Sequence, residues 1–173
     1  MIRRTLLALT GLAVLLAPAT LPAQTAGVDP KAAFQRLQSL AGTWEGYATH
    51  EKTGPPATVV YRSASNGSVV MEDLFPGTNH EMISMYYLDG GELVMTHYCA
   101  MANQPHMRLD RKASTPDTLV FAFDGGSNLD PAKDGHIHSG VIGFEGDGLQ
   151  ADWAVWQGGK ESGHNRFFLT KKK

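Results

Sequence analysis

Hydrophobic and polar residues alternate along most of the chain after Gly42, and turn-forming residues separate the alternating stretches. Alternation with a period of two is typical of β-strands that bury one face. The pattern predicts ten strands, at residues 44–50, 57–65, 68–75, 80–89, 92–100, 106–111, 118–124, 136–146, 149–157 and 163–170.

Glycine-containing pairs separate several of these strands and favour tight hairpins. Asn66-Gly67, Gly90-Gly91 and Asp147-Gly148 all tolerate the positive φ that such turns require. Strands that follow one another without a helical spacer pair in antiparallel fashion, and closing the sheet removes its exposed edges. We therefore predict an all-β fold, with a single closed antiparallel barrel of about ten strands over residues 42–173.

The segment before the barrel has two parts. Arg3 and Arg4 precede an apolar run at 6–16, and small residues follow near positions 19 and 23, which is the pattern of a secretory signal peptide over residues 1–23. This predicts export to the periplasm or the medium, with no membrane span after removal of the signal. Residues 24–41 then form a lead segment and a short N-terminal helix at 31–40, where apolar residues recur at helical spacing.

Composition narrows the function classes. Hydrophobic residues make up 42% of the chain and charged residues 18%, a balance typical of globular proteins. The net charge of −2 provides no basic surface for nucleic acid. Cys99 is the only cysteine, so the chain forms no internal disulfide.

Hairpin pairing predicts which side chains face the barrel interior. Around Asp147-Gly148, the predicted register places Ile142 opposite Trp153 and Phe144 opposite Ala151, and this face is apolar. The alternation predicts that Gln150 and Asp152 face solvent. Around Asn66-Gly67 the pattern leaves both faces open: one carries Val59, Tyr61 and Glu72, and the other carries Val60, Arg62, Met71 and Asp73.

Three histidines fall on faces predicted to point inward. The 136–146 strand carries His136 and His138 on its apolar face, and the strand after Gly90-Gly91 carries His97 with apolar neighbours. A buried imidazole needs a hydrogen-bond partner, water or a ligand. We predict that the ligand site consists of His97, His136, His138, Tyr86, Met95 and Trp153, and we assign no catalytic residue.

Other chemistries use the same residues. His136 and His138 have a chelating spacing, and His97 would complete a divalent metal site for zinc or iron. Haem would need one axial histidine and an apolar pocket. A hydrolytic or redox enzyme based on Cys99 and His97 ranks third.

The run Gly42-Thr43-Trp44-Glu45-Gly46 resembles the start of barrels of the calycin superfamily, which includes lipocalins, fatty-acid-binding proteins and nitrobindin-like barrels. The stretch 96–100, with Asn103-Gln104-Pro105 after it, is similar to exported bacterial proteins of unassigned function. The resemblance implies a ten-stranded barrel with a ligand cavity. It also implies a haem-binding histidine on a late strand, where His164 is nearest.

The parity of that late strand argues against the haem role. If Phe167 and Leu169 are inside the barrel, His164 is outside. The predicted function is therefore an exported barrel whose largely apolar, histidine-containing cavity binds a small apolar or amphipathic molecule. A haem or metal protein is the alternative.

Overall fold

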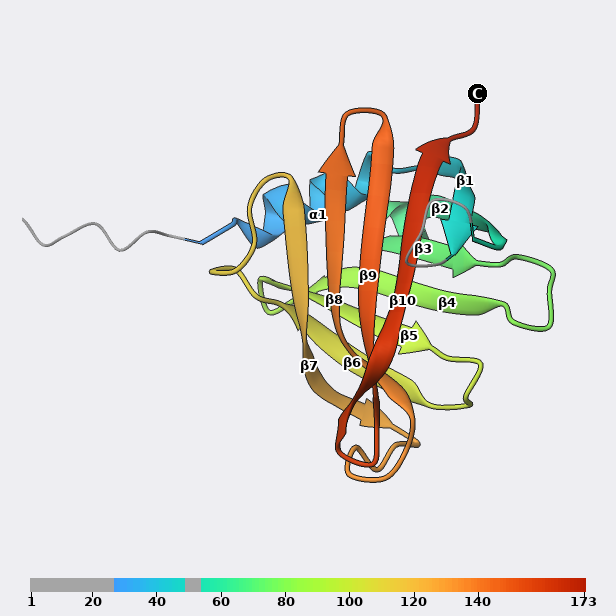
Figure 1. The fold of residues 1–173 in the computed structure, drawn as a ribbon. Helices are drawn as coiled ribbons and strands as arrows, with labels where there is room; N and C mark the ends of the chain where they lie inside the picture. The colour runs from blue at the N-terminus through green and yellow to red at the C-terminus, as the bar shows by residue number, and fades with distance from the viewer. Residues whose placement is uncertain (1–26, 49–53) are drawn as a thin grey trace, which may run out of the picture.

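The computed structural model describes residues 27–48 and 54–173. The predicted signal peptide lies outside the described residues. The described chain forms one helix and ten strands (Figure 1): α1 (Pro30–Gln38), β1 (Gly42–Ala48), β2 (Pro56–Ala64), β3 (Val69–Leu74), β4 (Met82–Asp89), β5 (Glu92–Tyr98), β6 (Gln104–Leu109), β7 (Thr118–Ser127), β8 (His136–Glu145), β9 (Gly148–Gln157) and β10 (Lys160–Lys171), with a short 3₁₀ turn, η1 (Ser65–Gly67), between β2 and β3.

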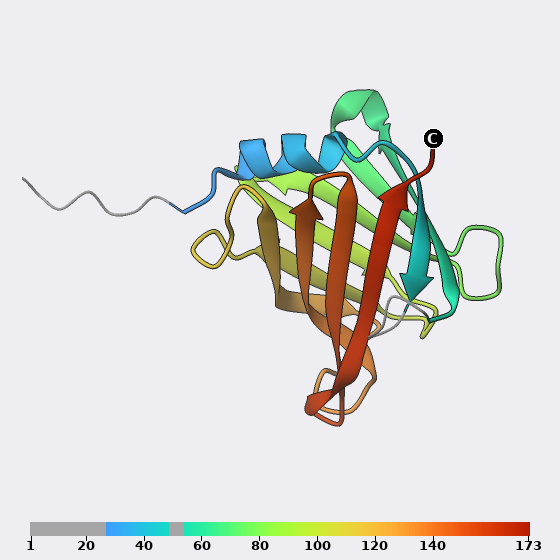
Figure 2. The same ribbon diagram turned by 45° about the horizontal axis from the view of Figure 1, so that its top comes forward.

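The ten strands close into one barrel, which confirms the predicted fold class. Each strand pairs in antiparallel fashion with its neighbour in sequence, and β1 pairs with β10 to complete the ring. Figure 2 shows the closed sheet from a second direction. This architecture fits a calycin-like barrel, as the sequence resemblance implies.

Helix α1 lies across one end of the barrel (Figure 2). The Asp29 carboxylate accepts a hydrogen bond from the backbone N–H of Ala32 at 3.0 Å, which caps the first turn. Phe34 and Leu37 are buried, and the helix contacts β2, β4 and β5. The Trp44 indole donates to the carbonyl of Leu40 at 2.8 Å and fixes the start of β1 beneath the helix. No helix among the described residues is long and apolar enough to span a membrane.

The turn between β8 and β9 lies one residue earlier than predicted. Glu145 pairs with Gly148, so Gly146 and Asp147 form the turn, and Gly146 has a φ of 57°. The predicted partners are therefore wrong by two positions: Ile142 pairs with Ala151, Phe144 with Leu149, and Gly140 with Trp153. A shift of two keeps each side chain on its face.

The predicted inward face of this hairpin is accordingly buried. Ile142, Phe144 and Trp153 are at most 8% exposed. Gln150 and Asp152 lie on the opposite face, where they are half-buried because each contacts a polar neighbour.

Candidate ligand cavity at the barrel mouth

A cavity of about 470 Å³ opens at the end of the barrel away from α1, and no residue of the helix lines it. Strands β1, β3, β4, β5, β8, β9 and β10 all contribute to its wall. Most of the lining is apolar, and the polar groups are a minority. The lining residues are Ala48, Leu74, Phe75, His80, Met82, Ser84, His97, Cys99, Ala100, Met101, Ile137, Trp153, Val155, Asn165, Arg166 and Phe167.

His97 is the most deeply buried titratable group of this lining. Its side chain on β5 is 1% exposed, and its Nδ1 lies 3.0 Å from the hydroxyl oxygen of Ser84 on β4. Its Nε2 is buried, and no described residue hydrogen-bonds to it. Burial lowers the pKa of His97 from 6.5 to about 4, so the ring is neutral at physiological pH. His97 therefore lines an apolar cavity, and one nitrogen of its ring has no hydrogen-bond partner among the described residues.

A buried carboxylate lies behind this histidine. Glu72 on β3 is 1% exposed. The hydroxyl of Tyr61 donates to its Oε1 at 2.5 Å, and the hydroxyl of Tyr86 donates to its Oε2 at 2.8 Å. Burial raises the pKa of Glu72, and hydrogen bonds from Tyr61, Tyr86 and Ser84 oppose that rise. The carboxyl group thus has hydrogen bonds from two hydroxyl groups, and no cationic group among the described residues pairs with it.

The strand register builds this polar cluster as a single row across the sheet. Tyr61 is the Cα partner of Glu72, Glu72 is the partner of Ser84, and Ser84 is the partner of His97. Directly opposed residues share a face and stand close together. Four neighbouring strands therefore place these polar side chains in one row, which begins in the core at Tyr61 and ends at His97 in the cavity wall.

The structure places the other two predicted histidines elsewhere. His136 Nε2 lies 3.0 Å from His138 Nδ1, and His136 Nδ1 lies 2.9 Å from the carbonyl of Asp134. The His138 ring stacks between Trp156 and Phe123, with centroid distances of 3.7 and 4.5 Å. Neither histidine lines the cavity. A β-bulge between Ile137 and Ser139 interrupts the alternation from which their inward orientation was predicted.

The remaining predicted site residues divide between cavity and core. Trp153 lines the cavity from β9. Tyr86 and Met95 are Cα partners that are at most 1% exposed, and neither lines the cavity. Tyr86 reaches the site indirectly, through its hydrogen bond to Glu72.

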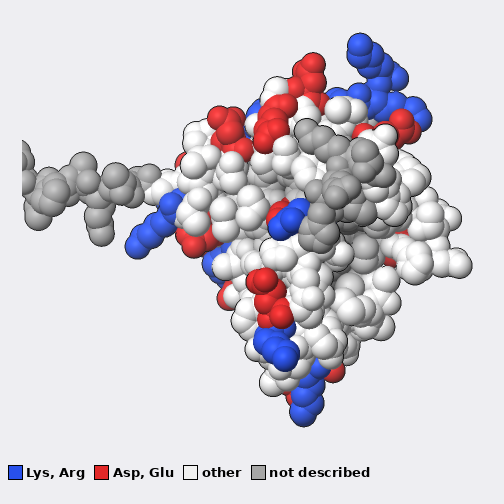
Figure 3. Space-filling view, in the orientation of Figure 1, with Lys and Arg blue, Asp and Glu red and all other residues white. Residues whose placement is uncertain are grey.

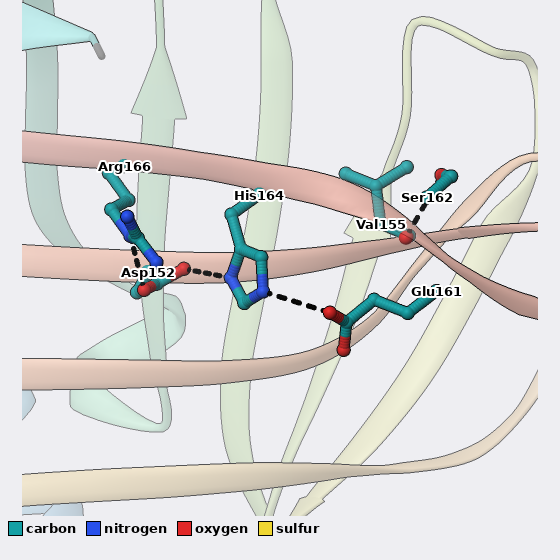
Figure 4. Close-up of polar contacts among 6 residues, drawn as sticks. All are labelled: Asp152, Val155, Glu161, Ser162, His164 and Arg166. Carbon is teal, nitrogen blue, oxygen red and sulfur yellow. Dashed lines mark hydrogen bonds and ion pairs between the residues drawn. The ribbon is translucent and has the colours of Figure 1, made fainter. Parts of the chain in front are cut away.

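His164 lies in a separate polar cluster around β9 and β10 (Figure 4). Its Nδ1 lies 2.5 Å from Asp152 Oδ1, its Nε2 lies 3.3 Å from Glu161 Oε1, and Arg166 Nε donates to Asp152 Oδ2 at 2.6 Å. The hydrogen bond to Asp152 is the main cause of a raised pKa at His164. Because both ring nitrogens of His164 are engaged, this residue does not fit the role of an axial haem ligand.

Two further chemistries receive little support from the geometry. Burial raises the pKa of the Cys99 thiol, which disfavours the thiolate that a nucleophilic enzyme would need. Within residues 27–48 and 54–173, no group of three or more histidine, cysteine, aspartate or glutamate side chains is arranged to hold a metal ion.

Glu72 and Ser84 are the functional candidates that sequence reasoning missed. Glu72 shares a strand face with Val59 and Tyr61 in the hairpin pairing, and burial of that apolar pair would have identified the carboxylate as buried. Ser84 carries no signal of its own. Its position follows only from the register between β3, β4 and β5.

The chain shows no match to protein-family models or to curated proteins.

The surface adds one observation: on the face shown in Figure 3, acidic and basic side chains are interspersed across a largely uncharged surface. The proposed function below is therefore based on the cavity and not on a charged surface.

Proposed function

We propose that this protein binds a small, largely apolar molecule in the cavity at the barrel mouth, with His97 as the polar anchor. The volume of about 470 Å³ falls within the range of small-molecule sites. Such sites combine apolar walls with a few polar groups that fix the orientation of the ligand. Leu74, Ile137 and Phe167 supply walls of this kind, and Ser84 with His97 supplies the polar end.

The observation that carries the proposal is the unused Nε2 of His97. A buried polar atom without a hydrogen-bond partner destabilises a protein by about 1–3 kcal/mol. That cost disappears when a bound molecule supplies the missing hydrogen bond. The rest of the row is satisfied internally, since Glu72 receives hydrogen bonds from Tyr61 and Tyr86.

We place this binding outside the cytoplasm, on the strength of the signal-like pattern in residues 1–23. The bound partner is then a small apolar or amphipathic molecule of the periplasm or medium. A barrel that shields such a molecule from water would act as its carrier or reservoir.

Binding can be tested with N-phenyl-1-naphthylamine, an apolar fluorescent probe. Val155 lines the cavity, whereas Val141 is 38% exposed on the outer surface of β8. We expect V155W to fill the cavity and weaken probe binding about ten-fold or more, and V141W to bind as the wild type does. Equal binding by wild type and V155W, or no binding by the wild type, would contradict the proposal.

The absorbance spectrum of the purified protein separates the haem alternative. An imidazole with one free nitrogen is also what an axial haem ligand requires. If the wild type shows a Soret band and His97→Leu does not, the ligand is haem and not the proposed apolar molecule. Native mass spectrometry of the same sample would reveal a co-purified organic molecule, as we propose.

A further inference from the structure

A second pocket lies at the α1 end of the barrel, opposite the cavity at the mouth. Its volume is about 720 Å³, and it shares no lining residue with that cavity. The last turn of α1, the start of β1, the turn between β8 and β9 and the end of β10 contribute its walls. The volume falls within the range of small-molecule sites.

The floor of this pocket is apolar and aromatic. Leu40, Trp44 and Phe144 line it, and each is at most 8% exposed. The Trp44 indole is held in place by its hydrogen bond to the carbonyl of Leu40. A fixed aromatic surface of this kind can pack against the ring or chain of a bound molecule.

Two cationic side chains stand over this floor. The guanidinium carbon of Arg36 lies 4.4 Å from the centroid of the Phe144 ring, and Lys171 Nζ lies 5.8 Å from the centroid of the Trp44 ring. Both distances are within the range of cation–π interactions. The strand register explains the second contact, because Lys171 on β10 is the Cα partner of Trp44 on β1, and directly opposed residues share a face.

Positive charge exceeds negative charge in the lining of this pocket. Lys172 and Lys173 add to the two cations over the floor, and Asp147 is the one acidic side chain among the described residues that line it. Basic side chains gather near the C-terminus, at the upper right of Figure 3, although the whole chain has a net charge of −2.

The carboxylates near the pocket balance only part of this charge. Glu45 pairs with Lys172 at 2.6 Å. Asp117 lies 3.8 Å from Arg36, and both side chains of that pair are well exposed, so the contact is weak. Lys171 has no carboxylate partner within the part of the chain that the structure describes. The two cations over the aromatic floor are therefore available to a bound anion.

We propose that this pocket is a second binding site, and that it takes a small organic anion with an apolar ring or chain. The apolar part would pack on Trp44 and Phe144. The carboxylate, sulfonate or phosphate group would accept hydrogen bonds from Arg36 and Lys171, and such charge-assisted bonds are stronger than neutral ones. A neutral molecule of the same shape would gain only the apolar contact. This site is independent of the proposed function, because the pocket and the mouth cavity share no residue.

Two fluorescent probes test the location of the site and its preference for an anion. The probes are 8-anilino-1-naphthalenesulfonate and N-phenyl-1-naphthylamine, which share one carbon skeleton and differ by the sulfonate group. Trp44 lies in the floor of the pocket, and Trp153 lines the mouth cavity. In ¹⁵N–¹H spectra of the wild type, we expect the sulfonate to shift the indole N–H signal of Trp44. The neutral amine should shift the signal of Trp153 instead.

Fluorescence titration of the sulfonate into V155W, in which the mouth cavity is filled, isolates the second site. Adding Arg36→Gln and Lys171→Gln to this protein should weaken binding about ten-fold or more, because both hydrogen-bond donors of the anion lose their charge. Adding Lys160→Gln instead should leave binding unchanged, since Lys160 is an exposed lysine at the other end of β10. Raising the NaCl concentration from about 20 mM to about 0.5 M should also weaken binding, because salt screens exposed charges.

The outcomes separate this site from the mouth cavity. A sulfonate that shifts only Trp153, or that binds equally well without the charges of Arg36 and Lys171, would overturn the second site. Failure of the sulfonate to bind would overturn it too, and would not affect the proposed function, which the neutral amine tests at Trp153. A neutral amine that shifts Trp44 as strongly as the sulfonate does would show that the pocket does not select anions.

Discussion

Acidification should destabilise this protein through His97. The pKa of this ring falls from 6.5 to about 4 on burial, and no carboxylate of the described residues lies within hydrogen-bonding distance to stabilise its cation. Between those two values the unfolded chain binds a proton at this position and the folded chain does not. The free energy of unfolding therefore decreases as the pH falls through this window.

The magnitude follows from the size of the shift. One pKa unit corresponds to 1.36 kcal/mol, so a fall from 6.5 to about 4 corresponds to a loss of about 3 kcal/mol. Glu72 acts in the opposite direction. Its pKa is raised, so its contribution to stability is fully present below the ordinary value of 4.5 and is lost as the pH rises through the folded value. The effect of His97 must therefore be isolated by a variant.

Urea unfolding at pH 7, 6, 5 and 4 on wild type and His97→Gln provides that comparison. Glutamine does not titrate and retains a polar atom that can contact Ser84. We expect the stability of the wild type relative to His97→Gln to fall by about 3 kcal/mol from pH 7 to pH 4. A stability difference between wild type and His97→Gln that stays constant with pH would refute the reasoning.

Three further predictions concern packing and processing. Trp153→Ala should lower the free energy of unfolding by about 3–5 kcal/mol, because Trp153 is 3% exposed; a loss under about 1 kcal/mol in urea unfolding would contradict this. Gly140→Ala should lower the free energy of unfolding by about 1–3 kcal/mol, because an added Cβ would lie 2.0 Å from Cζ3 of Trp153 on the neighbouring strand. A variant as stable as the wild type would show that β8 and β9 move apart at little cost. Mass spectrometry of the exported protein should show loss of about 19 or about 23 residues, and an intact N-terminus would argue against a signal peptide.

The fold was predictable because the pattern and the turns agreed. Alternation after Gly42 located all ten strands to within a few residues, and Gly90-Gly91 form the predicted turn between β4 and β5. The error at β8–β9 arose because Gly146, Asp147 and Gly148 all tolerate turn geometry. Sequence alone cannot choose between the neighbouring pairs, and the structure places the turn at Gly146-Asp147.

The site was predictable only in part. His97 and Trp153 line the cavity, and the alternation of side chains within a single hairpin predicts the inward orientation of each. His136 and His138 do not line the cavity, because a β-bulge at His138 interrupts the alternation, and nothing in the local sequence indicates this bulge. Predicting the position of Glu72 would have required the relative register of three strands, and alternation within one strand does not determine that register.

The buried row from Tyr61 to His97 makes a purely structural role a poor explanation. A structural polar network would end on partners inside the protein, because a half-satisfied network destabilises the fold more than an apolar core does. This row is satisfied at its core end, where Tyr61 and Tyr86 donate to Glu72. At its other end His97 lines the cavity, and its Nε2 has no hydrogen-bond partner among the described residues. Replacing buried polar groups with apolar ones of similar volume is often neutral or stabilising. The row therefore supports the proposal that the cavity binds a ligand.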